Sequence, residues 1–134
     1  MNAESSQKGL FWMNRKNMQK AQQLIIHSSP LALGIVVSYL FWRSNMLLLA
    51  LYLLAVLFLI LSGKDKKVES WIVLYGMVTG LIIEGVGTSV SGYQSFAQPD
   101  IFGIPYWLVV VWGYGFLLMK RVSLIIATES PWAR

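Results

Sequence analysis

The sequence predicts an all-α membrane protein, with four transmembrane helices in a bundle and a short N-terminal amphipathic helix at the membrane interface. Two observations support the bundle. Of the 134 residues, 56% are hydrophobic and 13% are charged, whereas a soluble domain usually has about 25% charged residues. The charged residues also form short clusters between long apolar runs, which is the pattern of an integral membrane protein. At this length we expect one domain over residues 1–134.

The N-terminal part predicts two elements. Residues 10–24 place apolar side chains on one side at helical spacing and basic or amide side chains mostly elsewhere, which indicates a short helix lying on the cytoplasmic leaflet. A simple lead-in to the first span fits these residues equally well. The first span covers residues 25–42. Because proline suits the first turn of a helix, we expect the regular helix to begin near Pro30.

Three further apolar runs complete the bundle. The second span, residues 46–62, consists almost entirely of Leu, Val, Ala, Ile and Phe. The third span covers residues 71–90 and the fourth covers 104–119, with a polar loop between them. Each run is long enough to cross a hydrocarbon core about 30 Å thick, with some mismatch.

The basic residues predict the orientation. Ten of the eleven Lys and Arg residues lie before the first span, between the second and third spans, or after the fourth. Arg43 alone lies on the opposite side. Because positive charge stays inside, we expect a multi-pass protein of the cell's inner (cytoplasmic) membrane with both termini cytoplasmic. The net charge of +5 then faces anionic lipid, and no nucleic-acid partner is expected.

The third span contains one carboxylate, Glu84, which is the candidate catalytic residue. A charged group at the membrane centre costs about 2.5–3.5 kcal/mol on insertion scales, so such groups usually have a function. Gly76, Gly80, Glu84 and Thr88 follow each other at helical spacing and form one stripe. Small residues on a stripe let another helix approach closely. Two interpretations stay open: a packing face with a neutral, hydrogen-bonded Glu, or a binding or proton-handling site.

Depth in the membrane suggests partners for Glu84. Counting the rise of each helix, Tyr39, Tyr52 and Trp112 fall at about the same level. We therefore predict a polar and aromatic layer in which a neutral Glu84 donates a hydrogen bond to one of these three side chains. With no cysteine and a single histidine in the chain, we expect no metal site and no cofactor.

A resemblance adds a candidate function. The order Glu84-x-x-Gly87, Gly92-Tyr93, Phe102-Gly103-Ile104-Pro105-Tyr106-Trp107 and Trp112 resembles the bacterial and archaeal carotenoid hydratases and, more distantly, the lycopene cyclase-type membrane proteins. The resemblance covers residues 84–112. It implies binding or modification of an isoprenoid or carotenoid-like lipid, with Glu84 as the acid and Asp100 as the nearby carboxylate that hydration would need. The candidate ligand-binding residues are Tyr39, Tyr52, Gly80, Thr88, Tyr93 and Trp112.

Two other classes were weighed against this one. Small multidrug transporters also have four helices and one membrane Glu, but theirs lies in the first helix, and the first span here has no acid. The second class is a non-catalytic accessory or structural subunit of a larger membrane complex, in which the glycine stripe would dock a partner helix. Membrane lipid, an isoprenoid ligand and partner membrane subunits are therefore the expected partners.

Overall fold

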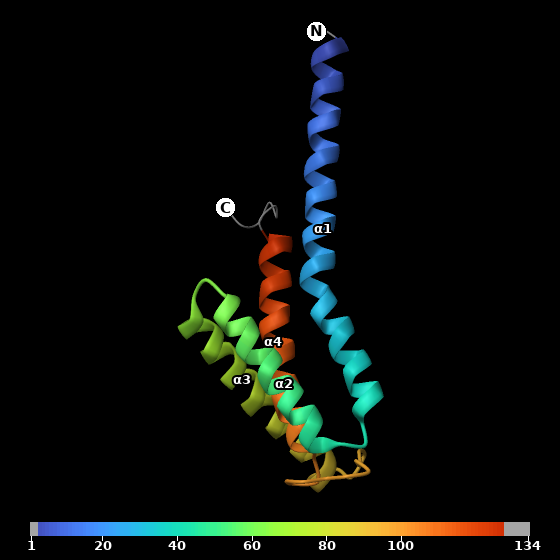
Figure 1. Ribbon diagram of the computed structural model, residues 1–134, viewed down its shortest axis with the longest axis vertical. Coiled ribbons are helices and arrows are strands. Elements are labelled where there is room, and N and C mark those ends of the chain that lie inside the picture. The colour runs from blue at the N-terminus through green and yellow to red at the C-terminus, as the bar shows by residue number, and fades with distance from the viewer. Residues whose placement is uncertain (1–2, 128–134) are drawn as a thin grey trace.

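The chain forms a bundle of four long helices (Figure 1). The computed structural model describes residues 3–127, and the side chains of residues 18–127. The helices are α1 (Ala3–Phe41), α2 (Asn45–Ser62), α3 (Lys66–Gly85), which continues into the π-helical turn η1 (Val86–Val90), and α4 (Tyr106–Ala127). All four contain a stretch long and apolar enough to cross a membrane. The predicted all-α fold with four candidate spans is confirmed.

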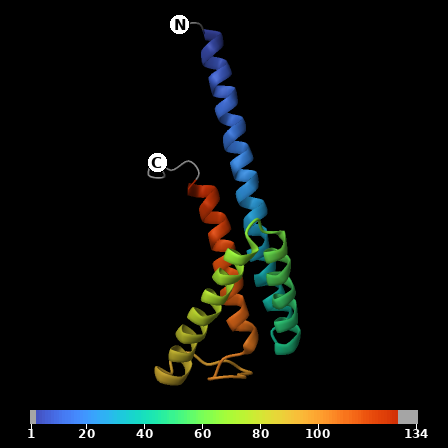
Figure 2. The same ribbon diagram turned by 90° about the vertical axis from the view of Figure 1, so that its left-hand side faces the viewer.

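Helix α1 differs from the expectation. The backbone of residues 3–41 is one continuous helix, so a separate interfacial helix is not confirmed, and the predicted start near Pro30 is wrong. Pro30 has no N–H to bond the carbonyl of Ile26, and the Ser29 hydroxyl donates to that oxygen instead, at 2.8 Å. The helix therefore continues through the proline with a bend, and it projects beyond the other three helices (Figures 1 and 2).

The other helices begin or end beyond the expected spans for local reasons. Helix α3 starts at Lys66, before the expected Trp71, because the Asp65 carboxylate accepts a hydrogen bond from the Val68 N–H at 3.1 Å and caps the helix. Helix α4 starts at Tyr106, whose N–H donates to Asp100 Oδ2 at 3.0 Å. It runs on to Ala127, past the expected end.

Helix α4 is the element against which the other three pack. Helices α3, α2 and α1 all contact it, whereas α2 makes smaller contacts with α1 and α3. The buried core comes mostly from α2 and α4, with one residue from α3: Leu48, Tyr52, Val56, Leu59, Val73, Val110, Tyr114, Leu117 and Leu118. Because α4 is central, the glycines of α3 pack against α4.

Helices α3 and α4 cross at very short range. A Cβ atom added to Gly76 would lie 2.9 Å from the Cα of Gly113, and one added to Gly80 would overlap the side chain of Trp112. Only glycine allows the two backbones to approach this closely. The prediction that the glycine stripe faces another helix is confirmed, and that helix is α4.

The loop between α3 and α4, residues 91–105, is tied to the bundle at several points. The hydroxyls of Thr88 and Ser89 both donate to the carbonyl of Phe102 at 2.8 Å. The Asn45 amide at the start of α2 donates to Asp100 Oδ2 at 3.0 Å. Phe102 and Gly103 have φ values of 48° and 80°, in the left-handed region where such turns are built. The loop is therefore anchored to α2, η1 and α4.

The arrangement of the helix ends gives a test of topology. The turn between α2 and α3 and the end of α4 lie at one end of the bundle, and the loop 91–105 lies at the other (Figures 1 and 2). Because the basic residues gather at the first end, a cysteine replacing exposed Ser95 should react with an impermeant maleimide added to intact cells. Lys66→Cys, also exposed, should react only after permeabilisation. The reverse labelling pattern would contradict the proposed orientation.

The close crossing predicts opposite effects for two glycines of the same segment. Gly80→Ala should lower the melting temperature of the detergent-solubilised protein, because overpacking against Trp112 costs about 1–3 kcal/mol. Gly85→Ala is the matched control. A Cβ there meets nothing within 4 Å, and alanine is favoured over glycine inside a helix by about 0.5–1 kcal/mol. An equal drop in melting temperature for both variants would show that α4 does not pack closely against Gly80.

Candidate functional site

The carboxylate of Glu84 joins three parts of the chain. Trp112 Nε1 of α4 donates to Glu84 Oε1 at 3.1 Å, and Gln94 Nε2 of the loop donates to Glu84 Oε2 at 2.7 Å. Both oxygens act as acceptors, so the prediction that Glu84 donates a hydrogen bond is wrong. Of the three proposed partners, only Trp112 bonds it.

Gly80 positions the tryptophan. Because Gly80 has no side chain, the Trp112 ring lies directly against α3, and its N–H reaches the carboxylate one turn further along. Trp112 also packs against Phe116 with 6.3 Å between ring centroids. The indole is thus held by contacts on two sides. Gly80, Glu84 and Trp112 form one unit, which we call the Glu84 cluster.

Thr88 and Tyr93 lie beside this cluster without touching the carboxylate. The Thr88 hydroxyl oxygen is 2.9 Å from the backbone carbonyl of Glu84 and 2.8 Å from that of Phe102, so it links α3 to the loop. The Tyr93 hydroxyl lies over Gly87, where an added Cβ would be 2.6 Å from it. The Tyr93 side chain is otherwise exposed. Both residues shape the π-helical end of α3.

Tyr39 and Tyr52 do not join the cluster, and the predicted shared layer is wrong for both. Tyr39 is 79% exposed on α1. Tyr52 is buried, but its hydroxyl donates to the Gly34 carbonyl at 2.8 Å and bonds Ser38 Oγ at 2.7 Å. Equal depth does not make two side chains neighbours. Tyr39 belongs to α1, and the Tyr52 hydroxyl bonds α1, whereas Glu84 belongs to α3.

Three aromatic side chains of α2 and α4 pack together, and two of them hold α1 against the bundle by hydrogen bonds. Tyr52 stacks on Trp107 with ring centroids 6.2 Å apart, and it meets Tyr114 edge-on at 5.6 Å. The Tyr114 hydroxyl donates to the backbone carbonyl of Pro30. Two tyrosine hydroxyls therefore bond carbonyls of α1 near its proline, since a carbonyl oxygen has two lone pairs and can accept a second hydrogen bond.

A large cavity lies beside these tyrosines. It has a volume of about 790 Å³ between α1 and α2, and its lining is almost entirely apolar. The residues that line it are Ser29, Pro30, Ala32, Leu33, Val36, Leu54, Ala55, Phe58, Leu59 and Tyr114. Glu84 is not among them. The apolar space and the Glu84 cluster are therefore separate features of the protein.

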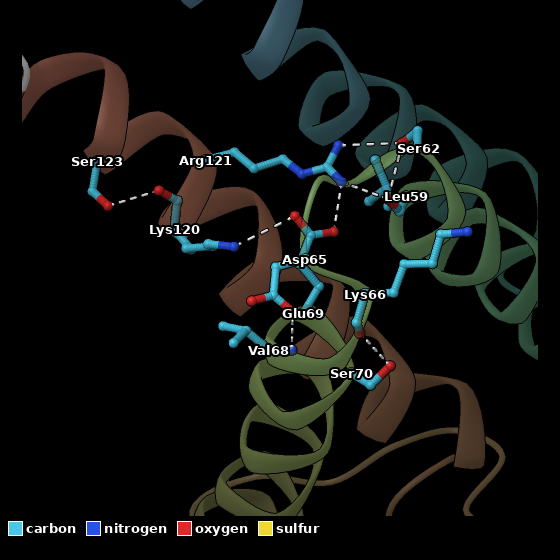
Figure 3. A network of polar contacts seen from close by, with 10 residues as sticks. All are labelled: Leu59, Ser62, Asp65, Lys66, Val68, Glu69, Ser70, Lys120, Arg121 and Ser123. Atoms are coloured by element: carbon cyan, nitrogen blue, oxygen red, sulfur yellow. Dashed lines mark hydrogen bonds and ion pairs between the residues drawn. The ribbon is translucent and has the colours of Figure 1, made fainter.

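A buried carboxylate, Glu69, was missed from the sequence. It is 4% exposed and pairs with Arg121 at 2.8 Å and Lys120 at 3.4 Å, which reach it from α4 (Figure 3). A signal was present, because Glu69 continues the stripe of Val73 and Gly76 towards the start of α3. Gln94 was also missed as a partner of Glu84, since nothing in a loop sequence shows which way it folds.

Among the residues that the structure describes, no group of three His, Cys, Asp or Glu side chains could hold a metal ion. Comparison of the chain with protein-family models, characterised proteins and solved structures finds no match. The resemblance of residues 84–112 to carotenoid-modifying proteins stays a prediction.

The Glu84 cluster predicts a graded loss of stability. Glu84→Ala removes the part-buried hydrogen bond from the Trp112 N–H, which costs about 0.5–1.5 kcal/mol, and it frees the loop at Gln94. Glu84→Gln keeps an oxygen for the indole and should cost less. Thermal melting in detergent measures the first effect, and limited proteolysis of the loop measures the second. Ile83→Ala, at an exposed neighbouring position, is the control, and an equal effect there would mean that the cluster adds nothing.

Proposed function

We propose that this protein binds an elongated apolar lipid of the isoprenoid or carotenoid kind in the cavity between α1 and α2. The supporting observation is the cavity itself, whose volume of about 790 Å³ lies within the usual range for ligand pockets, roughly 300–1,000 Å³. Leu33 and Val36 on its α1 side are 63% and 51% exposed. A lipid can therefore enter from the membrane without passing through water.

The chemistry of the cavity favours an apolar ligand. Its lining follows α1 from Ser29 to Val36 and α2 from Leu54 to Leu59, which is roughly two helical turns, or about 10 Å. The Tyr114 hydroxyl is already bonded to Pro30, so few polar groups remain to recognise a headgroup. A stiff polyene loses little conformational freedom when it binds, which favours it over a saturated chain.

Binding fits the geometry better than modification. Acid catalysis requires the acid to reach the reacting atom of the ligand. Glu84 does not line the cavity, and both of its oxygens accept hydrogen bonds from Trp112 and Gln94. In this proposal Glu84 holds the loop 91–105 against α4 and leaves the ligand unchanged.

An accessory subunit of a larger membrane complex is the second candidate, and the exposure of α1 favours it. Only 6% of the apolar window of α1 is buried, against 22–28% for the other spans. Ile35 and Tyr39 are 66% and 79% exposed on that helix. In a membrane such a face contacts either lipid or the helix of another subunit.

Filling the cavity tests the proposal. Ala32→Trp places a large side chain on the exposed α1 wall of the cavity, whereas Ala50→Trp adds the same side chain to an exposed position of α2 outside it. Both proteins are purified from native membranes, and their lipids and proteins are identified by mass spectrometry. We expect a polyene or isoprenoid with the wild type and Ala50→Trp, unmodified by the protein, and at least about tenfold less with Ala32→Trp. A stoichiometric membrane protein without such a lipid would support the accessory subunit instead.

A further inference from the structure

A second cavity lies at the basic end of the bundle and has a different chemistry. Its volume is about 340 Å³, and it lies where α2 ends, α3 begins and α4 passes both. Lys64, Lys120 and Arg121 line it together with His27 of α1. We propose that this cavity binds the headgroup of an anionic phospholipid.

The cations of the cavity are held in place by one carboxylate. Glu69 bonds Arg121 at 2.8 Å and Lys120 at 3.4 Å. Arg121 also donates to the Leu59 carbonyl and lies 3.5 Å from Ser62 Oγ, so it bridges α2, α3 and α4 (Figure 3). One carboxylate between two cations leaves positive charge in excess. The ammonium of Lys120 is the more loosely bonded of the two, and it has three donors to offer a phosphate.

The two other charged side chains of the cavity, Lys64 and Asp65, carry opposite charges and leave the excess of positive charge unchanged. Lys64 adds a third cation, and its side chain is exposed. Asp65 is the second carboxylate of the lining, but one of its oxygens caps α3 through the Val68 N–H. Three cations against two carboxylates attract an anionic headgroup and give a neutral one no advantage.

An apolar groove begins where the polar cavity ends. A cavity of about 430 Å³ lies between α1 and α4, and its lining surface is almost entirely apolar. His27 lines both cavities, so the two lie on either side of that side chain. Gly115 forms part of the groove, and a Cβ there meets nothing within 4 Å. A phospholipid places its phosphate among the cations and an acyl chain in the groove, which a free phosphate cannot do.

This site is independent of the proposed function, because it uses the α4 side of α1 rather than the α2 side. It lies at the end of the bundle where the basic residues gather, the end that the charge distribution assigns to the cytoplasmic leaflet, where anionic lipids are found. Each lysine near such a headgroup contributes about fivefold in affinity.

Native mass spectrometry of the delipidated full-length protein in detergent, titrated with phosphatidylglycerol, tests the headgroup site. Lys64→Gln/Lys120→Gln should weaken binding by about 25-fold. The matched control is Lys66→Gln/Lys67→Gln, which removes the same charge from residues that do not line the cavity. The Lys66 side chain points away from Glu69, Lys120 and Arg121 (Figure 3). An equal loss in the control, or equal binding of phosphatidylcholine by the wild type, would overturn the proposal. If the double variant fails to fold, Lys64→Gln alone leaves the Glu69 pairs intact and should weaken binding about fivefold.

The groove is tested separately. Gly115→Leu places a side chain in the groove, starting from a Cβ position that meets nothing within 4 Å, and Gly85→Leu adds the same side chain at another open glycine. Phosphatidylglycerol should bind Gly115→Leu at least about tenfold more weakly than Gly85→Leu, whereas Ala32→Trp should bind it as the wild type does. Glycerol phosphate should not displace the lipid. Displacement by glycerol phosphate, or wild-type binding by Gly115→Leu, would show that no phospholipid occupies the site.

Discussion

The rest of the structure depends on the close approach of α3 and α4. Gly76 and Gly113 let the two backbones meet almost directly, and both polar links between the helices follow from that distance. At one end Trp112 lies on Gly80 and reaches Glu84. At the other end Lys120 and Arg121 of α4 reach Glu69 of α3. A larger side chain at the crossing would separate the helices and weaken both pairs of contacts, because each contact joins a side chain of α3 to one of α4.

Polar groups in these helices are paired within the protein, as an apolar solvent requires. Among the side chains of residues 18–127, no buried nitrogen or oxygen lacks a hydrogen-bond partner. The Ser29 hydroxyl bonds the carbonyl that Pro30 leaves free, and the hydroxyls of Tyr52 and Tyr114 bond carbonyls of α1. Glu84 follows the same rule, because both of its carboxylate oxygens accept hydrogen bonds from other parts of the protein. Recognition of a ligand therefore falls to the cavities.

The two apolar cavities exist because of the way helix α1 packs. It is held to the bundle by a few hydrogen bonds near its proline and by limited apolar contact, so it stands away from α2 on one side and from α4 on the other. The gap between α1 and α2 is the apolar cavity, and the gap between α1 and α4 is the groove. A helix packed as tightly as α3 would leave neither. Loose packing of one span is thus the physical basis of the apolar part of both proposed lipid sites, whereas the cations of the headgroup site come from the turn after α2 and from α4.

The sequence by itself determined the features that depend on local pattern: four apolar helices, basic residues clustered outside the spans, and a glycine face on α3 that includes Glu84. It also placed Gly80 and Trp112 near that carboxylate. The tertiary structure alone decided which helices are neighbours, because depth in the membrane leaves the position around the bundle open. For that reason Tyr39 and Tyr52 were assigned to the wrong group, and Gln94 and the pairing of Glu69 were missed. Pro30 was mistaken for a helix start for a different reason: the Ser29 hydroxyl bonds the carbonyl that the proline cannot, so the helix continues.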